Sequence, residues 1–404
     1  MKNVLILSCS TGQGHNSCAQ AVKEYFDKRD MNCEIQDTLG FISMEFSKFM
    51  SWGHSFMYRH IPGLFRWGYE YSKKHPGVFK PNSGIYKILT AGAKRMYQYI
   101  AEKQFDTVIC THVFSAIILT HMQKIYSVSL KTAMIITDYT CYPGMNAIDM
   151  QQYFIPCESL IEEFVQNGVP RERIVPTGIP VCRSFLKEIG KADAKRLLNI
   201  DAGNRHLLIM CGSMGCGPIA KMLKQIAENL PEHTEVSVIC GTNRNLQKKL
   251  ERNYKKSQRI HIVGYTRQMS LYMDSADLCI MKPGGLSVTE AAVKKLPMAF
   301  INAVAGCEQY NINFFAGMGA AIASDFPGEL VDKSFCILES NEKWEQMETA
   351  LQAYRQPDSA KLIYDFIENF CETKTLWKER RGAESINLTL QSSFAESSQA
   401  SSMY

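Results

Sequence analysis

The sequence predicts an α/β protein with two Rossmann-like domains, each a doubly wound parallel sheet, that face each other across a crevice. Three observations carry this prediction. The length of 404 residues exceeds one ordinary core and suits two domains of about 150–200 residues each. Short β-branched runs alternate with helical patterns along the chain. Each run has a mainly apolar centre instead of a strict apolar-polar alternation, which is typical of strands that helices cover on both faces.

Seven strands are expected, in two series. The first series comprises NVLILS, DTVICT and TAMIIT, and the second comprises RHLLIMC, EVSVIC, RIHIVG and LCIM. Residues 1–180 should form the N-terminal domain and residues 181–375 the C-terminal domain, with Pro176 and Pro180 marking a linker. We expect a helix at 376–392 and a disordered Ser-rich tail at 393–404. Because open α/β sheets bind ligands beyond the carboxyl ends of their strands, the loops at those ends should converge in the crevice.

Composition excludes several classes of protein. The fourteen cysteines are scattered without a CxxC pair, so neither a zinc site nor a disulfide framework is indicated. A reducing cytoplasm is the expected setting. The N-terminus has too short an apolar run for a secretory signal, and no stretch approaches the roughly 18 apolar residues of a membrane span.

An insertion at about 41–105 in the first domain carries an uneven charge. It holds ten Lys or Arg against three acids, a net charge of +7, whereas the rest of the chain nets −2. Fifteen aromatics are interleaved with these cations. That mixture predicts reversible binding to an anionic membrane surface, since rings sit at headgroup depth and cations attract the leaflet. The alternatives are a helical insertion whose aromatics are core, and nucleic acid, which the lack of a basic groove elsewhere disfavours. The candidate membrane and acceptor residues are Trp52, Arg59, Arg66, Trp67, Lys73 and Lys74.

The first strand leaves through Thr11-Gly12-Gln13-Gly14 and places His15 at the mouth of a helix. Glycines allow a sharp turn and a close approach to a ligand, and the free N–H groups of a helix start favour anions. His15 should therefore face the crevice and act on the substrate, although local packing or capping is the alternative. Asp138, at the end of the strand in IITDY, is a second candidate base, with turn capping as its alternative.

Two further glycine loops follow strands of the second domain. CGSMGCG places Gly212, Gly215 and Gly217 before a helix, a geometry that suits a phosphate or a tight turn. Pro283-Gly284-Gly285 breaks a later strand, and Glu290 is expected in the first turn of the next helix. There the carboxylate either complements the helix dipole or accepts both hydroxyls of a ribose.

Four segments carry a family resemblance: STGQGHNSCAQAV, CGTNRNLQKKL, VGYTRQMSLYMDSADLCIMKPGGLSVTEA and GCEQYNINFF. Together they resemble the monogalactosyldiacylglycerol synthase and processive diacylglycerol β-glucosyltransferase group, which are GT-B glycosyltransferases related to MurG. The resemblance implies a GT-B fold, with His15 and its glycines near the acceptor and a UDP-sugar in the second domain. Cys307 stands where the family's sugar-binding motif has glutamine, which leaves the donated sugar undecided. The implied donor-binding residues are Gly14, Gly212, Ser213, Gly241, Asn243, Gly264, Tyr265, Thr266, Met269, Lys282, Pro283, Gly284, Gly285, Ser287, Thr289, Glu290, Glu308 and Asn311.

The resemblance also implies an activity. It predicts an inverting transfer of a hexose from a UDP-sugar to diacylglycerol, or to a glycosyl-diacylglycerol, on the inner face of the cell membrane. No paired carboxylates stand beside the donor loops, so neither a metal nor another cofactor is expected; backbone amides and Lys282 are expected to meet the diphosphate charge. Two alternatives stay open: a GT-B sugar-nucleotide epimerase, and a non-catalytic UDP-sugar sensor.

Overall fold

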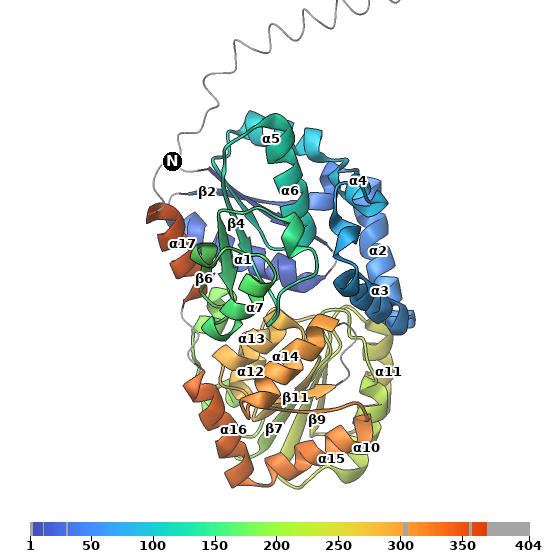
Figure 1. The fold of residues 1–404 in the computed structure, drawn as a ribbon. Coiled ribbons are helices and arrows are strands. Elements are labelled where there is room, and N and C mark those ends of the chain that lie inside the picture. The colour runs from blue at the N-terminus through green and yellow to red at the C-terminus, as the bar shows by residue number, and fades with distance from the viewer. Residues whose placement is uncertain (1–2, 11, 30, 302–305, 355–357, 370–404) are drawn as a thin grey trace, which may run out of the picture.

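Two parallel six-stranded sheets, one above the other in Figure 1, form the two domains of the computed structural model. The structure describes residues 3–10, 12–29, 31–301, 306–354 and 358–369. Helices cover both faces of each sheet, which explains why the central strands are mainly apolar and buried. The predicted pair of doubly wound domains is confirmed.

The first sheet has the strand order β2-β1-β3-β4-β5-β6. Its strands are β1 (Asn3–Ser8), β2 (Asn32–Asp37), β3 (Thr107–Cys110), β4 (Lys131–Ile135), β5 (Gln152–Ile155) and β6 (Ile174–Pro176). The three runs expected here correspond to β1, β3 and β4. The sequence analysis missed β2 and β6, which are edge strands with mixed burial, and β5, which has only four residues.

The second sheet has the strand order β12-β11-β10-β7-β8-β9. Its strands are β7 (Arg205–Met210), β8 (Thr234–Ile239), β9 (Ile260–Val263), β10 (Leu278–Met281), β11 (Met298–Ile301) and β12 (Ala321–Ser324). All four runs expected in this domain are strands, whereas β11 and β12 were not foreseen. The segment of β12 is AIAS, whose small residues give no strong strand signal.

The helices alternate with the strands. In the first domain they are α1 (Gln13–Phe26), α2 (Met44–His60), α3 (Pro62–Lys74), α4 (Gly84–Thr90), α5 (Ala93–Lys103), α6 (Val113–Tyr126) and α7 (Ile161–Gln166). After α8 (Arg183–Leu186), the second domain has α9 (Lys191–Leu197), α10 (Ile219–Asn229), α11 (Arg244–Tyr254), α12 (Met269–Ser275), α13 (Gly285–Val293), α14 (Gly306–Gly317), α15 (Pro327–Leu338) and α16 (Asn341–Ala353). Short 3₁₀ turns occupy Asp27–Arg29, Thr38–Phe41, Pro76–Phe79, Met145–Ala147, Glu158–Leu160 and Arg171–Arg173.

The last described helix, α17 (Ser359–Asn369), crosses back to the first domain (Figure 1). The ring of Tyr364 packs against Tyr25 and Phe26 of α1, and Phe366 packs against Phe154. The predicted C-terminal domain, 181–375, therefore ends on a helix that belongs to the core of the other domain. Apolar packing across domains leaves no local trace in the sequence of α17. The expected helix at 376–392 and the tail at 393–404 lie outside the described residues.

Each sheet has one point where the direction of winding reverses. In the first sheet β1 lies between β2 and β3, and in the second β7 lies between β8 and β10. The crevices at such points, beyond the carboxyl ends of the strands, are where open α/β sheets bind ligands. The loops that leave these strands carry His15 after β1, His112 after β3, the glycines after β7 and Lys282 after β10.

The insertion predicted at 41–105 divides into two parts. Residues of α4 and α5 pack on the first domain, where Tyr86, Leu89, Met96 and Ile100 are buried. The α2 and α3 helices form a pair at the edge of that domain (Figure 1), and several of their aromatic side chains remain exposed. The alternative in which all these aromatics are core is thus wrong for α2 and α3.

Candidate active site

The two domains meet where α1 begins and α13 begins. A side chain at Gly285 would place its Cβ 1.9 Å from the Thr137 carbonyl oxygen, so only glycine allows this approach of α13 to the end of β4. Gly14, in the first turn of α1, faces Leu286 of α13 at an ordinary contact distance of 3.8 Å from the position of a Cβ. The histidine loop and the Pro283-Gly284-Gly285 loop thus face each other, as the crevice model predicts.

His15 is held in one orientation by the first domain. Its Nδ1 lies 2.7 Å from the Thr111 carbonyl oxygen and 3.1 Å from the Thr137 hydroxyl. Because a carbonyl only accepts, Nδ1 carries the proton and donates it to Thr111. The other nitrogen, Nε2, then keeps its lone pair and is able to accept a proton.

Two further histidines surround His15. The ring of His112 stands edge-on to it, with ring centroids 4.6 Å apart, and His112 Nδ1 accepts the Phe114 N–H at the start of α6. Burial lowers the pKa of His15 to about 4 and also lowers the pKa of His54 to about 4. Burial, with His15 and His54 nearby, lowers the pKa of His112 further. All three imidazoles are therefore neutral at pH 7.

Asp138 lies at the domain junction with both carboxylate oxygens engaged. Oδ1 accepts the Gly285 N–H at 3.2 Å and the Asn311 amide at 2.7 Å, both from the second domain. Oδ2 accepts the Tyr142 hydroxyl at 2.8 Å. Burial raises the pKa of Asp138, against the effect of these three hydrogen bonds. In this arrangement the carboxylate links the two domains.

Asn311 and Thr289, expected at the donor sugar and diphosphate, are also used at the junction. The Asn311 side chain accepts the Tyr139 N–H at 2.8 Å and donates to Asp138 and to the Pro283 carbonyl. The Thr289 hydroxyl lies 2.9 Å from the Tyr139 hydroxyl and donates to the Gly285 carbonyl. Both side chains are fully buried, so in this structure they are satisfied by protein groups. Ligand contact by either residue stays a prediction.

Hydrogen bonds connect the glycine loops that follow β7 and β8 in the second domain. Gly212, Gly215, Gly217 and Gly241 all have positive φ, which favours glycine. Asn243 caps α11 by accepting the Leu246 N–H, and its amide donates to the Gly215 carbonyl. The Ser213 carbonyl accepts the Thr242 N–H at 2.8 Å. The turns after β7 and β8 therefore form one rigid rim, which presents its backbone at the start of α10.

Lys282 lies beside that rim. Its Cε lies 3.9 Å from the position of a Cβ on Gly217, so it joins the loop after β7 to the loop after β10. Burial lowers the pKa of Lys282, and the nearby Glu308 carboxylate opposes this effect. Glu308, predicted at the sugar, is itself buried in the first turn of α14. A cation among turning backbone amides suits a diphosphate.

Glu290 differs from its predicted position. Because α13 begins at Gly285, Glu290 lies in the second turn, and the first-turn placement is wrong. Ser287 precedes it by one turn and is likewise inside the helix. Burial raises the pKa of Glu290 to about 8. Its carboxylate has no hydrogen-bond or ion-pair partner in the described part of the chain, so dipole capping no longer explains it, and a ligand hydroxyl would satisfy it.

The predicted base-binding loop lies at the end of β9. A Cβ on Gly264 would come within 2.5 Å of the Gln247 side chain of α11, so the loop packs tightly on that helix. Tyr265 is exposed, the Thr266 hydroxyl caps the turn by accepting the Gln268 N–H, and Met269 opens α12. The loop is formed, and its contact with a base stays a prediction.

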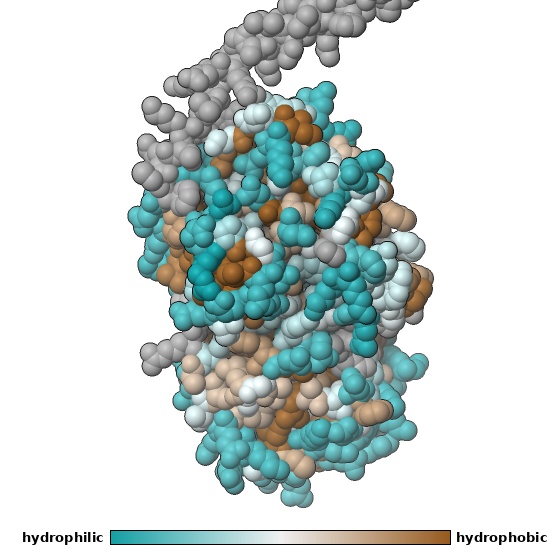
Figure 2. Space-filling view, viewed as in Figure 1, coloured by the Kyte–Doolittle hydropathy of each residue, from teal (hydrophilic) through white to brown (hydrophobic). Residues whose placement is uncertain are grey.

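The candidate membrane residues divide into two groups. Trp52 of α2 and Trp67 of α3 are each 62% exposed, and Figure 2 shows hydrophobic residues along the margin where these helices lie. Lys74 and Arg66 are exposed as well. Lys73 is exposed too, but it bonds the Tyr310 hydroxyl of α14 and lies 4.6 Å from the centre of its ring. The Arg59 side chain lies outside the described residues.

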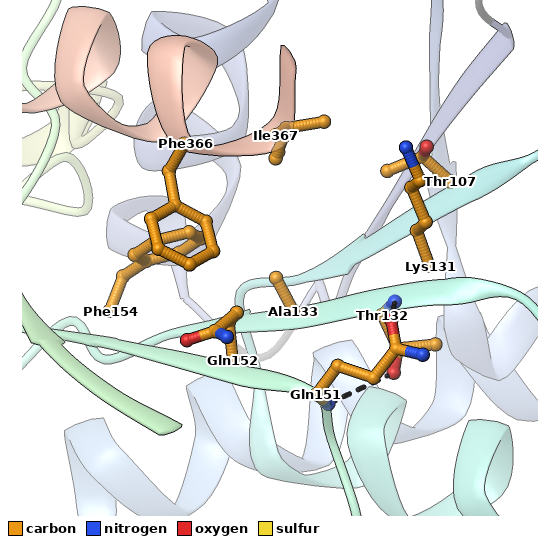
Figure 3. Close-up of a pocket in the computed structure, with 9 residues that line it drawn as sticks. All are labelled: Thr107, Lys131, Thr132, Ala133, Gln151, Gln152, Phe154, Phe366 and Ile367. Atoms are coloured by element: carbon orange, nitrogen blue, oxygen red, sulfur yellow. Dashed lines mark hydrogen bonds between the residues drawn. The ribbon is translucent and has the colours of Figure 1, made fainter. Parts of the chain in front are cut away.

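A separate hollow lies at the opposite ends of the strands (Figure 3). Thr107, Thr132 and Gln152 line it from the starts of β3, β4 and β5, and Phe366 and Ile367 of α17 cover it. It is therefore remote from the carboxyl-end crevice. Across the residues that the structure describes, no cluster of three His, Cys, Asp or Glu side chains suits a metal ion.

Sequence reasoning missed several groups of the site. His112 and Thr111 follow β3 just as His15 follows β1, so the strand-end rule that selected His15 also applies to them. Tyr139 also follows a strand end, but its role depends on a contact with Thr289 in the other domain, and Tyr142 is recognised only by its hydrogen bond to Asp138. Tyr69 of α3, which contacts the second domain, was counted only among the interfacial aromatics.

Two domains of this strand order, whose glycine loops face each other at the junction, define a GT-B protein. Among solved structures, MurG from Acinetobacter baumannii matches with a TM-score of 0.61 at 16% identity, covering 92% of this chain and 100% of that one. The UDP-GlcNAc 2-epimerase from Neisseria meningitidis, bound to UDP-GlcNAc, also has a TM-score of 0.61, at 13% identity over 91% and 100%. At these identities the likeness establishes the fold alone.

Sequence comparisons show which families of GT-B proteins the two domains resemble. Residues 15–181 match the monogalactosyldiacylglycerol (MGDG) synthase family, and residues 206–363 match the glycosyltransferase family 28 C-terminal domain. A processive diacylglycerol beta-glucosyltransferase of Staphylococcus saprophyticus is 25% identical over 374 residues, 91% of this chain and 92% of the relative. The first domain therefore matches the monogalactosyldiacylglycerol synthase family and the second matches the C-terminal domain of glycosyltransferase family 28, in agreement with the resemblance.

Proposed function

We propose that this glycosyltransferase moves a hexose from a UDP-sugar to diacylglycerol, or to a glycosyl-diacylglycerol, with inversion at the anomeric carbon. The observation that carries the proposal is the meeting of two loops at the junction. A neutral histidine with a free lone pair stands on one side, and a glycine loop with Lys282 and the unpartnered Glu290 stands on the other. The names of the curated relatives supply diacylglycerol as the acceptor.

The second domain holds the donor in this proposal. The ribose hydroxyls donate to Glu290, and the diphosphate lies against the rim of Gly212, Gly215 and Gly217 with Lys282 beside it. As the sugar departs, negative charge grows on the diphosphate. Fixed amides, the start of α10 and the lysine stabilise that charge without having to reorganise.

The first domain holds the acceptor and its base. His15 Nε2 takes the proton from the lipid hydroxyl while that oxygen attacks the anomeric carbon, and the bond from this carbon to the diphosphate oxygen breaks. A single displacement of this kind turns an α-linked donor into a β-linked product. Asp138 is the competing base, and its engagement by Gly285, Asn311 and Tyr142 favours His15.

The acceptor is a membrane lipid, so the protein must reach a bilayer. No helix within the described ranges is long and apolar enough to cross one. The exposed face of α2 and α3, with Phe49, Trp52, Phe56, Leu64 and Trp67 beside exposed cations, suits the headgroup region of an anionic leaflet. Reversible binding on the cytoplasmic side of the cell membrane follows from this proposal.

The epimerase alternative shares the fold and several structural neighbours. An epimerase acts on a soluble sugar nucleotide, and an exposed face of tryptophan and phenylalanine serves no purpose there. The sensor alternative requires binding without turnover. Both alternatives predict that no sugar appears on lipid.

The test is to incubate the protein with each of UDP-glucose, UDP-galactose and UDP-GlcNAc, in the presence of vesicles that contain diacylglycerol. Mass analysis of the lipids should show a mass increase of one hexose or more with one of the first two donors. Conversion of UDP-GlcNAc to an epimer would support the epimerase. Binding of UDP-sugars without any product would support the sensor.

A further inference from the structure

The α3 helix, which carries part of the exposed apolar face, also touches the second domain. The ring of Tyr69 lies over Gly306, the first residue of α14, so closely that a Cβ there would stand 2.1 Å from the Tyr69 Cδ1 atom. Four residues further along α3, Lys73 bonds the Tyr310 hydroxyl and faces its ring. Two successive turns of α3 are therefore fitted to the first turns of α14.

The place of this contact is informative. The start of α14 holds Gly306, Cys307 and the buried Glu308, and Asn311 one turn later binds the Asp138 carboxylate. Tyr69 thus reaches the junction that also holds the predicted sugar-binding motif. Burial raises the pKa of the Tyr69 hydroxyl, and the nearby Cys307 and Asp138 act in the same direction.

The Tyr69 hydroxyl lacks a hydrogen-bond partner among the residues that the structure describes. The Tyr69 side chain is only partly buried, so water can reach this hydroxyl and a ligand hydroxyl can replace that water. Cys307 beside it offers only a weakly hydrogen-bonding thiol. A ligand that reaches the start of α14 with a hydroxyl of its own would satisfy the phenol.

We propose that the Tyr69 hydroxyl hydrogen-bonds a hydroxyl of the sugar that is transferred. This inference rests on the proposed function, and it assigns a donor contact to a helix of the acceptor domain. Since Tyr69 lies on the same helix as Trp67, the sugar site is complete only when α3 rests on α14. The helix that faces the membrane thereby takes part in sugar recognition.

Replacement of Tyr69 by phenylalanine tests the proposal, because the ring that packs on Gly306 stays and only the hydroxyl is lost. Calorimetry on the full chain should show UDP-glucose binding weakened about 3- to 10-fold, the usual effect of one neutral hydrogen bond, with UDP binding unchanged. The matched control is Tyr364→Phe, which removes the hydroxyl of a partly buried tyrosine on the far side of the first domain. It should change neither affinity.

A series of UDP-glucose analogues, each lacking one hydroxyl, locates the contact. One analogue should bind the wild-type protein more weakly and should lose nothing more in Tyr69→Phe, since the two changes remove the same bond. Equal weakening of UDP and UDP-glucose, or wild-type affinity for both, would overturn the role of Tyr69. A wild-type protein that binds neither nucleotide would instead overturn the proposed function itself.

Discussion

At the scale of single residues, burial sets the protonation states of His15, the proposed base, and of Glu290, the proposed hydrogen-bond acceptor for the ribose. Burial keeps His15 neutral, and the Thr111 carbonyl fixes its proton on Nδ1. Burial keeps Glu290 protonated near pH 7 until a ligand offers it hydrogen bonds. In the proposed reaction, His15 of the first domain acts on the acceptor and Glu290 of the second domain binds the donor.

His15→Ala should lower kcat by about 10²–10⁴-fold, the usual contribution of a general base, and should leave UDP affinity nearly unchanged. Because burial lowers the pKa of His15 to about 4, the imidazole stays unprotonated well below pH 6.5. Loss of kcat/KM through protonation of His15 is therefore expected only as pH falls toward about 4. Steady-state kinetics with diacylglycerol vesicles would measure both effects.

Asp138→Asn supplies the comparison. The amide keeps an oxygen for the Gly285 N–H and removes the charge, so turnover should fall less than in His15→Ala if His15 is the base. Near-normal turnover of His15→Ala together with an inactive Asp138→Asn would transfer the role to Asp138.

Glu290→Ala should weaken UDP binding by tens-fold or more, since two hydrogen bonds to a charged acceptor contribute about 2–4 kcal/mol. A second readout follows from the pKa of about 8. At pH 7 the free protein holds this proton, and ribose hydroxyls favour the carboxylate, so UDP-glucose binding should release most of one proton. Calorimetry in buffers of different ionisation enthalpy measures that release, and Glu290→Gln should abolish it. Unchanged affinity and no buffer dependence would leave Glu290 without a role in the pocket.

At the scale of elements, α3 exposes one face to solvent and packs another against α14. Trp67 and Lys74 are exposed, and the partly buried Tyr69 and the exposed Lys73 contact α14. An interval of three or four residues brings side chains to the same face of a helix, so the aromatic-and-basic pattern seen in the sequence mixes residues of both faces. The sequence analysis assigned all three cations of α3, which are Arg66, Lys73 and Lys74, to membrane binding.

Substitutions of the neighbouring residues Lys73 and Lys74 distinguish the roles of the two faces of α3. Lys74→Gln should weaken binding to anionic vesicles, and added salt should imitate the change, because each exposed cation contributes about 1 kcal/mol near a charged leaflet. Lys73 is also exposed, but Tyr310 engages its ammonium, so Lys73→Gln should have a smaller effect on vesicle binding and should instead weaken the contact with α14. Sedimentation with vesicles of varied anionic lipid content distinguishes them. Vesicle binding that is indifferent to lipid charge in the wild-type protein would contradict the membrane role of this face.

At the scale of the whole molecule, a polar clamp joins the domains. The ends of β4 and the starts of α13 and α14 exchange hydrogen bonds through Asp138, Tyr139 and Asn311. The α17 helix adds an apolar tie on the opposite side, against α1. These contacts fix the relative position of the histidine loop and the donor loops, on which the proposed chemistry depends.

Gly285→Ala tests the clamp, because its Cβ would stand 1.9 Å from the Thr137 carbonyl oxygen and backbone must move. The variant should unfold at a lower temperature and should lose transfer activity. Gly284→Ala is the matched control for stability, since nothing lies within 4 Å of a Cβ there. Calorimetric unfolding of both variants provides the measurement. Equal unfolding temperatures would show that the domain contact tolerates displacement at this point.

The sequence by itself determined the two sheets, the loops at their carboxyl ends and the family. Apolar runs such as NVLILS and LCIM are local signals, since a strand buried on both faces must be apolar along its length. Glycine loops before helices are equally local, and they led to His15 and Lys282. The edge strands β2, β6 and β12 were not predicted, because strands at the edge of a sheet are less buried and carry polar residues, as in β2, or small ones, as in β12.

Only the tertiary structure decided how these loops are used. Asn311 and Thr289 were expected to hold a ligand, and their side chains bind Asp138 and Tyr139 across the junction. Glu290 was expected at a helix start and stands one turn later, unpartnered. Tyr69 and Lys73 belonged to a surface pattern and rest on α14. Each of these outcomes depends on the distance between residues far apart in the chain, and residue type and spacing carry no information on which distant groups will meet.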